Sequence, residues 1–100
     1  MTDYELMGAA LAEAEQAAAL GEVPVGAVIA KDGEIIASAH NTRETEKNAL
    51  HHAELLAIDA ACKKLGGWRL WQCELFVTLE PFPMCSGAII NSRLKRVVYG

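Results

Sequence analysis

A histidine, a glutamate and a cysteine stand in this sequence at spacings that suit a hydrolytic metal site. His52 and Glu54 are separated by one residue, and Cys85 ends the segment Pro81-Phe82-Pro83-Met84-Cys85. Catalytic zinc usually takes three protein ligands and keeps a fourth position for water, whose pKa the metal lowers. A nearby carboxylate can then carry protons from that water to a leaving group.

The two segments match a known catalytic pattern at every position but one. Zinc-dependent nucleobase deaminases carry H-x-E followed by P-C-x-x-C, and Phe82 stands where the first cysteine of that pattern belongs. If His52 and Glu54 were both helical, their side chains would point about 200° apart. One could then hold a metal while the other reached the bound water. A helix beginning near Cys85 would stabilise its thiolate.

Taken singly, each of these residues has an ordinary structural explanation. A histidine at a helix start is usually a surface residue, and a glutamate in a first helical turn complements the helix dipole. A single cysteine is usually a small buried apolar residue. The combination at these spacings favours a site.

The elements that must position these residues follow from periodicity and turn signals. Thr2 and Glu5 have capping-box spacing, Asp32-Gly33 predicts a two-residue hairpin turn, and Gly66-Gly67 predicts a helix end. We expect helices over residues 2–20, 51–65 and 85–91, and strands over residues 23–30, 34–40, 74–79 and 96–99. The last two strands should be parallel, because a helix connects them.

The element order predicts an α/β fold with a mixed sheet and helices on both faces. One hundred residues suit a single domain, residues 1–100, with one core. A final strand at 96–99 would leave apolar side chains at a sheet edge. We therefore expect the natural chain to continue beyond a sheet that is truncated here after its fourth strand.

Composition and charge narrow the function classes. No apolar run is long enough to span a membrane, and three cysteines without an export signal favour reduced thiols in the cytoplasm. The net charge of −4 argues against a general nucleic-acid binder. Residues 1–60 hold eleven acids and three bases, whereas residues 61–100 hold two acids and six bases. Two interpretations of this basic end stay open: a solvated surface, or a face that binds phosphates. Its bases are Lys63, Lys64, Arg69, Arg93, Lys95 and Arg96.

Over its whole length the sequence resembles the bacterial tRNA-specific adenosine deaminases (TadA type) of the cytidine deaminase-like superfamily. The resemblance lies in the segments around residues 21–29, 39–41, 52–54, 77–81 and 83–88. It implies a three-layer cytidine deaminase-like fold, a missing C-terminal helix-strand-helix, and a homodimer. It also implies Zn²⁺ held by His52 and Cys85, with Glu54 as the proton shuttle. Asn41 and the backbone of Val25, Gly26 and Ala27 would hold the substrate.

The implied reaction is hydrolytic deamination of adenosine to inosine at the wobble position of tRNA, on the anticodon arm, with no DNA partner expected. Phe82 offers no lone pair, and neither Cys62 nor Cys73 should reach the vacant ligand position. We therefore expect weak zinc binding and impaired activity. A natural pseudoenzyme, an engineered zinc-site variant and a sequence error would all account for Phe82.

Two further functions remain open. One is a related deaminase that acts on guanine or cytosine as a free base or nucleoside. The other is a non-catalytic pseudo-deaminase that binds RNA or pairs with an active subunit.

Overall fold

The computed structural model describes residues 1–48, 50–79, 87, 89 and 92–100. The helix expected over residues 85–91 falls mostly outside this described part, as do Phe82 and Cys85. The other expected helices and strands are all present. They are α1 (Asp3–Ala19), β1 (Gly26–Lys31), β2 (Glu34–His40), α2 (Ala53–Leu65), β3 (Cys73–Val77) and β4 (Arg96–Tyr99).

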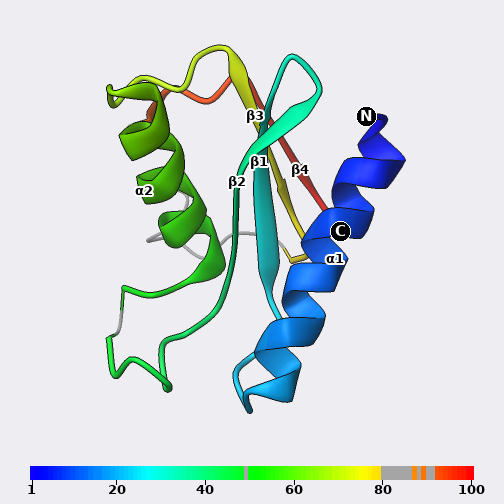
Figure 1. Ribbon diagram of the computed structural model, residues 1–100, viewed down its shortest axis with the longest axis vertical. Coiled ribbons are helices and arrows are strands. Elements are labelled where there is room, and N and C mark those ends of the chain that lie inside the picture. Colours follow the sequence, from blue (N-terminus) through cyan, green and yellow to red (C-terminus); the bar gives the residue numbers. More distant parts are fainter. Residues whose placement is uncertain (49, 80–86, 88, 90–91) are drawn as a thin grey trace.

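The four strands form one mixed sheet in the order β2-β1-β3-β4. Strand β1 runs antiparallel to both β2 and β3, and β4 runs parallel to β3. Figure 1 shows α1 on one side of the sheet and α2 on the other. The expected mixed sheet with helices on both faces is confirmed, as are the parallel final pair and the position of residues 96–99 at an edge.

The alternation of side chains along the central strands builds two apolar layers. Ala27 and Ile29 of β1 pack with α2, whereas Val28 of β1 and Phe76 of β3 pack with α1. Because both faces of β1 are covered, its residues read as a continuous apolar run rather than an alternating one.

Small residues let both helices lie close to the sheet. Ala53, Ala57 and Ala61 recur every four residues along α2, and each is fully buried. On the other face, a Cβ atom added to Gly26 would lie 2.0 Å from the carbonyl oxygen of Ala10 in α1. The positions of both helices are therefore fixed tightly against β1.

Helix and strand boundaries differ from the expected ones for local reasons. Strand β1 begins at Gly26 rather than residue 23, because Pro24 has no N–H and the Val25 N–H donates to the carbonyl of Val23 at 2.8 Å. Helix α2 begins at Ala53, and His52 is its N-cap in extended conformation. The expectation that His52 is itself helical was wrong. The capping box of Thr2 and Glu5 is confirmed.

In the described part of the chain, no helix has the length and apolar character needed to cross a membrane.

Candidate active site

The start of α2 brings the first predicted site residues together. His52 has φ −84° and ψ 150°, and its side chain does not cap the helix. An N-cap side chain normally accepts a hydrogen bond from one of the first helical N–H groups. The His52 imidazole is therefore not committed to holding the helix start.

Asn41 takes over part of the missing capping function from a distant point in the sequence. Its Oδ1 accepts a buried hydrogen bond of 2.8 Å from the N–H of Ala53, the first residue of α2. Its own N–H donates to the carbonyl of Val25 at 3.2 Å. Asn41 thus joins the entry to β1 to the start of α2, beside His52.

The backbone segment 25–27, predicted to contact the substrate, lies next to Asn41. Most of its N–H and carbonyl groups already form hydrogen bonds within the protein. The Gly26 N–H donates to the Thr78 hydroxyl at 3.2 Å, and the Gly26 carbonyl accepts from the Thr78 N–H at 3.1 Å. Ala27 is paired on both sides, with β2 and β3. The backbone N–H groups of Val25 and Gly26 are therefore already used within the protein.

Glu54 is a buried carboxylate in the first turn of α2, with 3% of its surface exposed. Glutamate is rarely buried to this extent unless it is paired. Its place in the first turn puts this carboxylate at the positive end of the α2 dipole, which favours a negative charge there. Its burial next to the predicted ligand His52 makes Glu54 a candidate for a functional carboxylate.

Glu22 is a second buried carboxylate, which sequence reasoning missed. It accepts hydrogen bonds from the N–H groups of Glu44 and Thr45 and from the Thr45 hydroxyl. The hydroxyl of Thr45, followed by these N–H groups, lowers the pKa of Glu22 against the opposing effect of burial. Its partners lie more than twenty residues away, so no local signal in the sequence could have identified it.

A cavity of about 150 Å³ lies between segments 22–23 and 41–44 and His52, the N-cap of α2. It is smaller than the 300–1,000 Å³ usual for drug-sized ligands, so it could hold only a small group. Two carboxylates, an amide, an imidazole and a guanidinium could contact such a group. The lining residues are Glu22, Val23, Asn41, Arg43, Glu44 and His52.

A family model described as the cytidine and deoxycytidylate deaminase zinc-binding region matches residues 1–100. The chain belongs to this deaminase family. The expectation drawn from the H-x-E segment and the residues around it is thereby confirmed at the level of the family.

Two curated bacterial relatives within the deaminase family each share more than half of their aligned residues with this chain. The tRNA-specific adenosine deaminase of Bacillus subtilis is 57% identical over 101 residues, covering 100% of this chain and 63% of the relative. That of Aquifex aeolicus is 53% identical over 90 residues, covering 90% of this chain and 60% of the relative. The chain spans about three fifths of the length of these proteins.

Solved deaminase structures confirm the cytidine deaminase-like fold. A structure from a study of A-to-I editing by tRNA:A34 deaminases has a TM-score of 0.94 at 42% identity, covering 97% of this chain and 70% of that one. The guanine deaminase of Bacillus subtilis has a TM-score of 0.96, also at 42% identity, covering 100% of this chain and 64% of that one.

The donor set for zinc is incomplete in this chain. The predicted ligands His52 and Cys85 would supply an imidazole and a thiolate, but the benzyl side chain of Phe82 has no lone pair to donate. Within the described residues, no group of three or more His, Cys, Asp or Glu side chains could hold a metal ion. The residues present therefore do not fit the three-ligand centre that the family's zinc-binding description implies.

Proposed function

We propose that this chain is the core of a tRNA adenosine deaminase whose zinc centre is impaired by Phe82. The observation that carries the proposal is the convergence of His52, Asn41 and a buried Glu54 at the start of α2, next to a small cavity. The naming of its 51–57% identical relatives as tRNA-specific adenosine deaminases supports adenosine in tRNA as the substrate. Residues 1–100 would form a single deaminase domain.

Hydrolytic deamination exchanges the 6-amino group of adenine for the oxygen of water and releases ammonia. A proton must move from the attacking water to the departing amine, and we assign that transfer to the Glu54 carboxylate. Asn41 would donate its amide N–H to the nucleoside, since its Oδ1 is already used by Ala53. The backbone carbonyls of Val25, Gly26 and Ala27 would supply further contacts.

We assign His52 and Cys85 to the metal and Phe82 to the empty third position. Removing residues that only support a metal ligand already weakens binding by 10- to 100-fold, so loss of a ligand should cost more. Replacement Phe82→Cys should therefore raise zinc affinity by more than about 100-fold. It should also raise inosine formation on an anticodon-arm RNA. Phe82→Ala is the matched control, because it removes the ring without adding a donor.

One tightly held zinc per parent chain would contradict this assignment, as would equal zinc content in Phe82→Cys and Phe82→Ala. A Phe82→Cys protein that binds zinc but forms no inosine would show that adenosine in an anticodon-arm RNA is not its substrate. The assay should then turn to free guanine, because the guanine deaminase of Bacillus subtilis is equally similar in structure. RNA binding without any turnover after metal is restored would identify a pseudo-deaminase.

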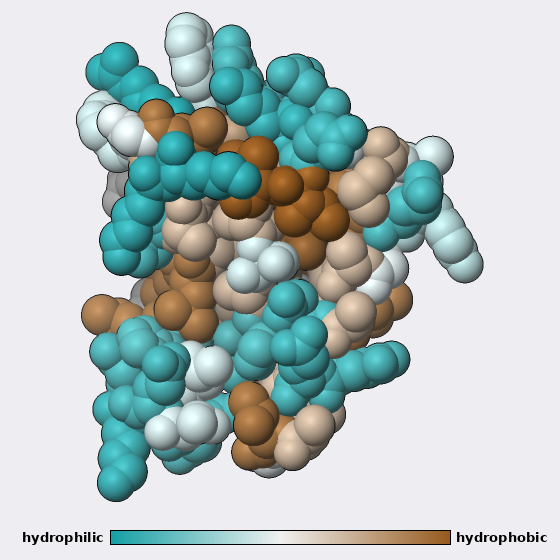
Figure 2. Space-filling model, in the orientation of Figure 1, coloured by the Kyte–Doolittle hydropathy of each residue, from teal (hydrophilic) through white to brown (hydrophobic). Residues whose placement is uncertain are grey.

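We also propose that the homodimer implied by the family resemblance forms through the outer side of α2. A groove of about 350 Å³ is lined by Leu50, His51, Leu55, Leu56 and Asp59, and Leu50 is 59% exposed. Figure 2 shows apolar atoms beside the lower half of α2. Leu55→Lys should shift the mass in solution toward a monomer, whereas Leu11→Lys on exposed α1 should not. An unchanged mass in both would refute this surface.

The proposed compartment is the cytoplasm. Cys62 and Cys73 are both free thiols, which suits a reducing environment.

A further inference from the structure

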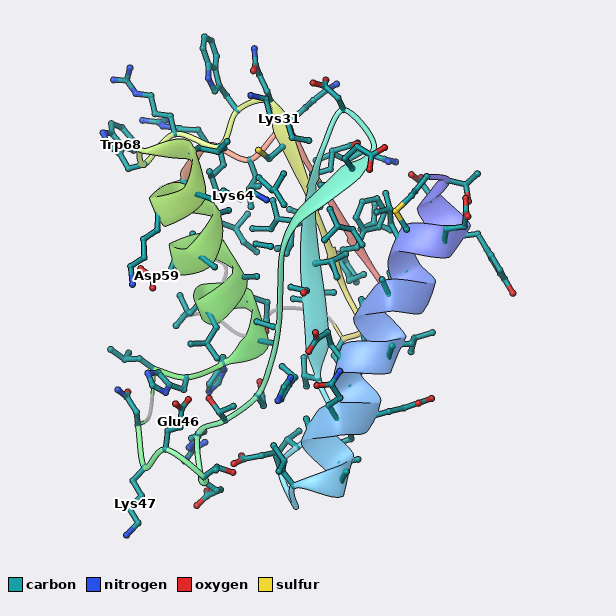
Figure 3. All side chains as sticks on the ribbon, in the orientation of Figure 1. Lys31, Glu46, Lys47, Asp59, Lys64 and Trp68 are labelled. Carbon is teal, nitrogen blue, oxygen red and sulfur yellow. The ribbon has the colours of Figure 1, made fainter. Side chains whose placement is uncertain are left out.

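A second face of the molecule combines positive charge with exposed tryptophans. It lies where α2 and β1 end and where β3 and β4 begin, at the opposite end of α2 from the cavity. Figure 3 shows Lys31, Lys64 and Trp68 at this end and Glu46 and Lys47 at the other, and Figure 2 shows hydrophilic side chains gathered there. We call it the basic–aromatic face; it consists of Lys31, Lys64, Trp68, Arg69, Trp71, Arg93 and Lys95.

Backbone contacts bring these distant residues to one place. Lys31 is paired with Cys73 across β1 and β3, and the carbonyl of Cys73 accepts from the Lys95 N–H at 2.9 Å. The Leu70 N–H donates to the carbonyl of Ser92 at 2.6 Å, which sets Arg69 and Arg93 on either side of one hydrogen bond. The cations come from four separate segments, so the sequence alone does not show the cluster.

The two tryptophans are exposed beside these cations. Trp68 is 56% exposed and Trp71 is 68% exposed, although large aromatic side chains are usually buried. The guanidinium of Arg69 lies 4.6 Å from the centre of the Trp68 ring. A hollow of about 200 Å³ adjoins them, lined by Lys31, Leu65, Arg69, Trp71, Gln72 and Cys73.

The positive charge of the face is only partly compensated. Two bases of the basic end are used in ion pairs: Lys63 with Asp59 at 2.8 Å, and Arg96 with both Asp3 and Glu74. In the described part of the chain, the five cations of the basic–aromatic face form no ion pair. The adjoining β1–β2 hairpin contributes two acids, Asp32 in the turn and Glu34 at the start of β2, opposite Lys31. Five cations against two acids leave a local excess in a chain of net charge −4.

We propose that the basic–aromatic face binds RNA. Its cations would contact phosphates while an exposed indole stacks on an unpaired base, which is the combination that single-stranded nucleic acids require. The inference rests on the proposed function and deepens it by naming a second contact on an RNA substrate. Helix α2 has 13 residues, so the face and the cavity lie about 20 Å apart. One RNA arm of several nucleotides would be needed to occupy both.

Tryptophan fluorescence tests the face directly, because Trp68 and Trp71 are the only tryptophans in the sequence. The probe is a short RNA hairpin without adenosine, titrated at several salt concentrations. We expect saturable quenching. Trp71→Ala should weaken binding by roughly 5- to 150-fold if one base stacks there.

Lys31→Gln and Arg69→Gln should each weaken binding severalfold and reduce the slope of log affinity against log salt by about 0.7 to 0.9. Lys47→Gln is the matched control, since it removes an exposed cation at the far end of the molecule. Its affinity should stay within about twofold of the parent value. Absence of quenching would overturn the inference, and so would equal losses in Lys47→Gln and Arg69→Gln.

A separate measurement distinguishes failure of the face from failure of the proposed function. Inosine formation is followed in a Phe82→Cys background, with and without Arg69→Gln. Retained hairpin binding without deamination of any RNA would refute the proposed function and leave the face standing. Full deamination with an unchanged KM in the Arg69→Gln protein, together with no fluorescence response, would refute the face alone.

Discussion

The hydrogen bond from Ala53 to Asn41 gives a quantitative prediction for the Asn41→Ala variant. Ala53 is fully buried, so water cannot replace Oδ1 as the acceptor for its N–H. Leaving a buried donor unsatisfied costs about 1–3 kcal/mol, and losing a helix cap costs about 0.5–2 kcal/mol. The two ranges are not added, because both estimate the loss of the same hydrogen bond. We expect a destabilisation of about 2 kcal/mol, or roughly 8–16 °C in Tm for a domain of this size.

Asn41→Asp is the matched comparison, because a carboxylate keeps the acceptor and lies at the positive end of the α2 dipole. Thermal and urea unfolding should place it within about 1 kcal/mol of the parent chain. It nevertheless removes the amide donor that we assign to the substrate. In a Phe82→Cys background, Asn41→Asp should therefore raise KM with little loss of stability. If Asn41→Asp unfolds as easily as Asn41→Ala, the hydrogen bond to Ala53 does not stabilise the helix start and the reasoning fails.

Three further predictions concern stability and reactivity. Gly26→Ala should destabilise the fold by about 3 kcal/mol or more in urea unfolding, because the added Cβ would overlap Ala10. Gly8→Ala is the control and should be neutral or stabilising, because its added Cβ would meet no atom within 4 Å. Equal effects of the two substitutions would contradict the close packing of α1 against β1. Because the folded-state pKa of Glu22 is lowered from 4.5, its contribution is complete above that pH and is lost as pH falls through the folded-state pKa. The difference in urea midpoint between the parent protein and Glu22→Gln should therefore become smaller as the pH is lowered. A difference that does not change with pH would show that the ionised Glu22 carboxylate does not stabilise the fold. Burial raises the pKa of the Cys73 thiol and shields it from reagents. Iodoacetamide should therefore label Cys73 in urea but not in the native protein, as measured by mass spectrometry. Rapid labelling of the native protein would show that the start of β3 opens to solvent.

Much of the fold could be predicted because its signals are local. The capping box at Thr2, the Asp32-Gly33 turn and the glycines after Leu65 each act within four residues, and each marks an element that the structure contains. The exact starts of β1 and α2 could not be predicted. The start of β1 depends on Pro24, and the start of α2 depends on the hydrogen bond that the Ala53 N–H donates to the distant Asn41.

The candidate site was only partly predictable for the same reason. His52 and Glu54 carry a recognisable spacing, and Asn41 was expected near them from the family resemblance. Glu22 gave no signal, because a carboxylate that organises a loop is defined by donors far along the chain. Arg96 belonged to the predicted basic end, yet its guanidinium is shared between Asp3 and Glu74. Charge counts cannot distinguish such a residue from an unpaired one.

The row of buried alanines on α2 has a consequence for how this scaffold could change its substrate. These alanines, Ala53, Ala57 and Ala61, have almost no side chain to shorten. Any larger residue would push α2 away from β1 and would displace His52 at its N-terminus. The loop over residues 42–47 is mostly exposed and is held by hydrogen bonds to Glu22, to His51 and within the loop itself. Directed evolution toward a different base should therefore collect its tolerated substitutions in this loop and leave the alanine row untouched.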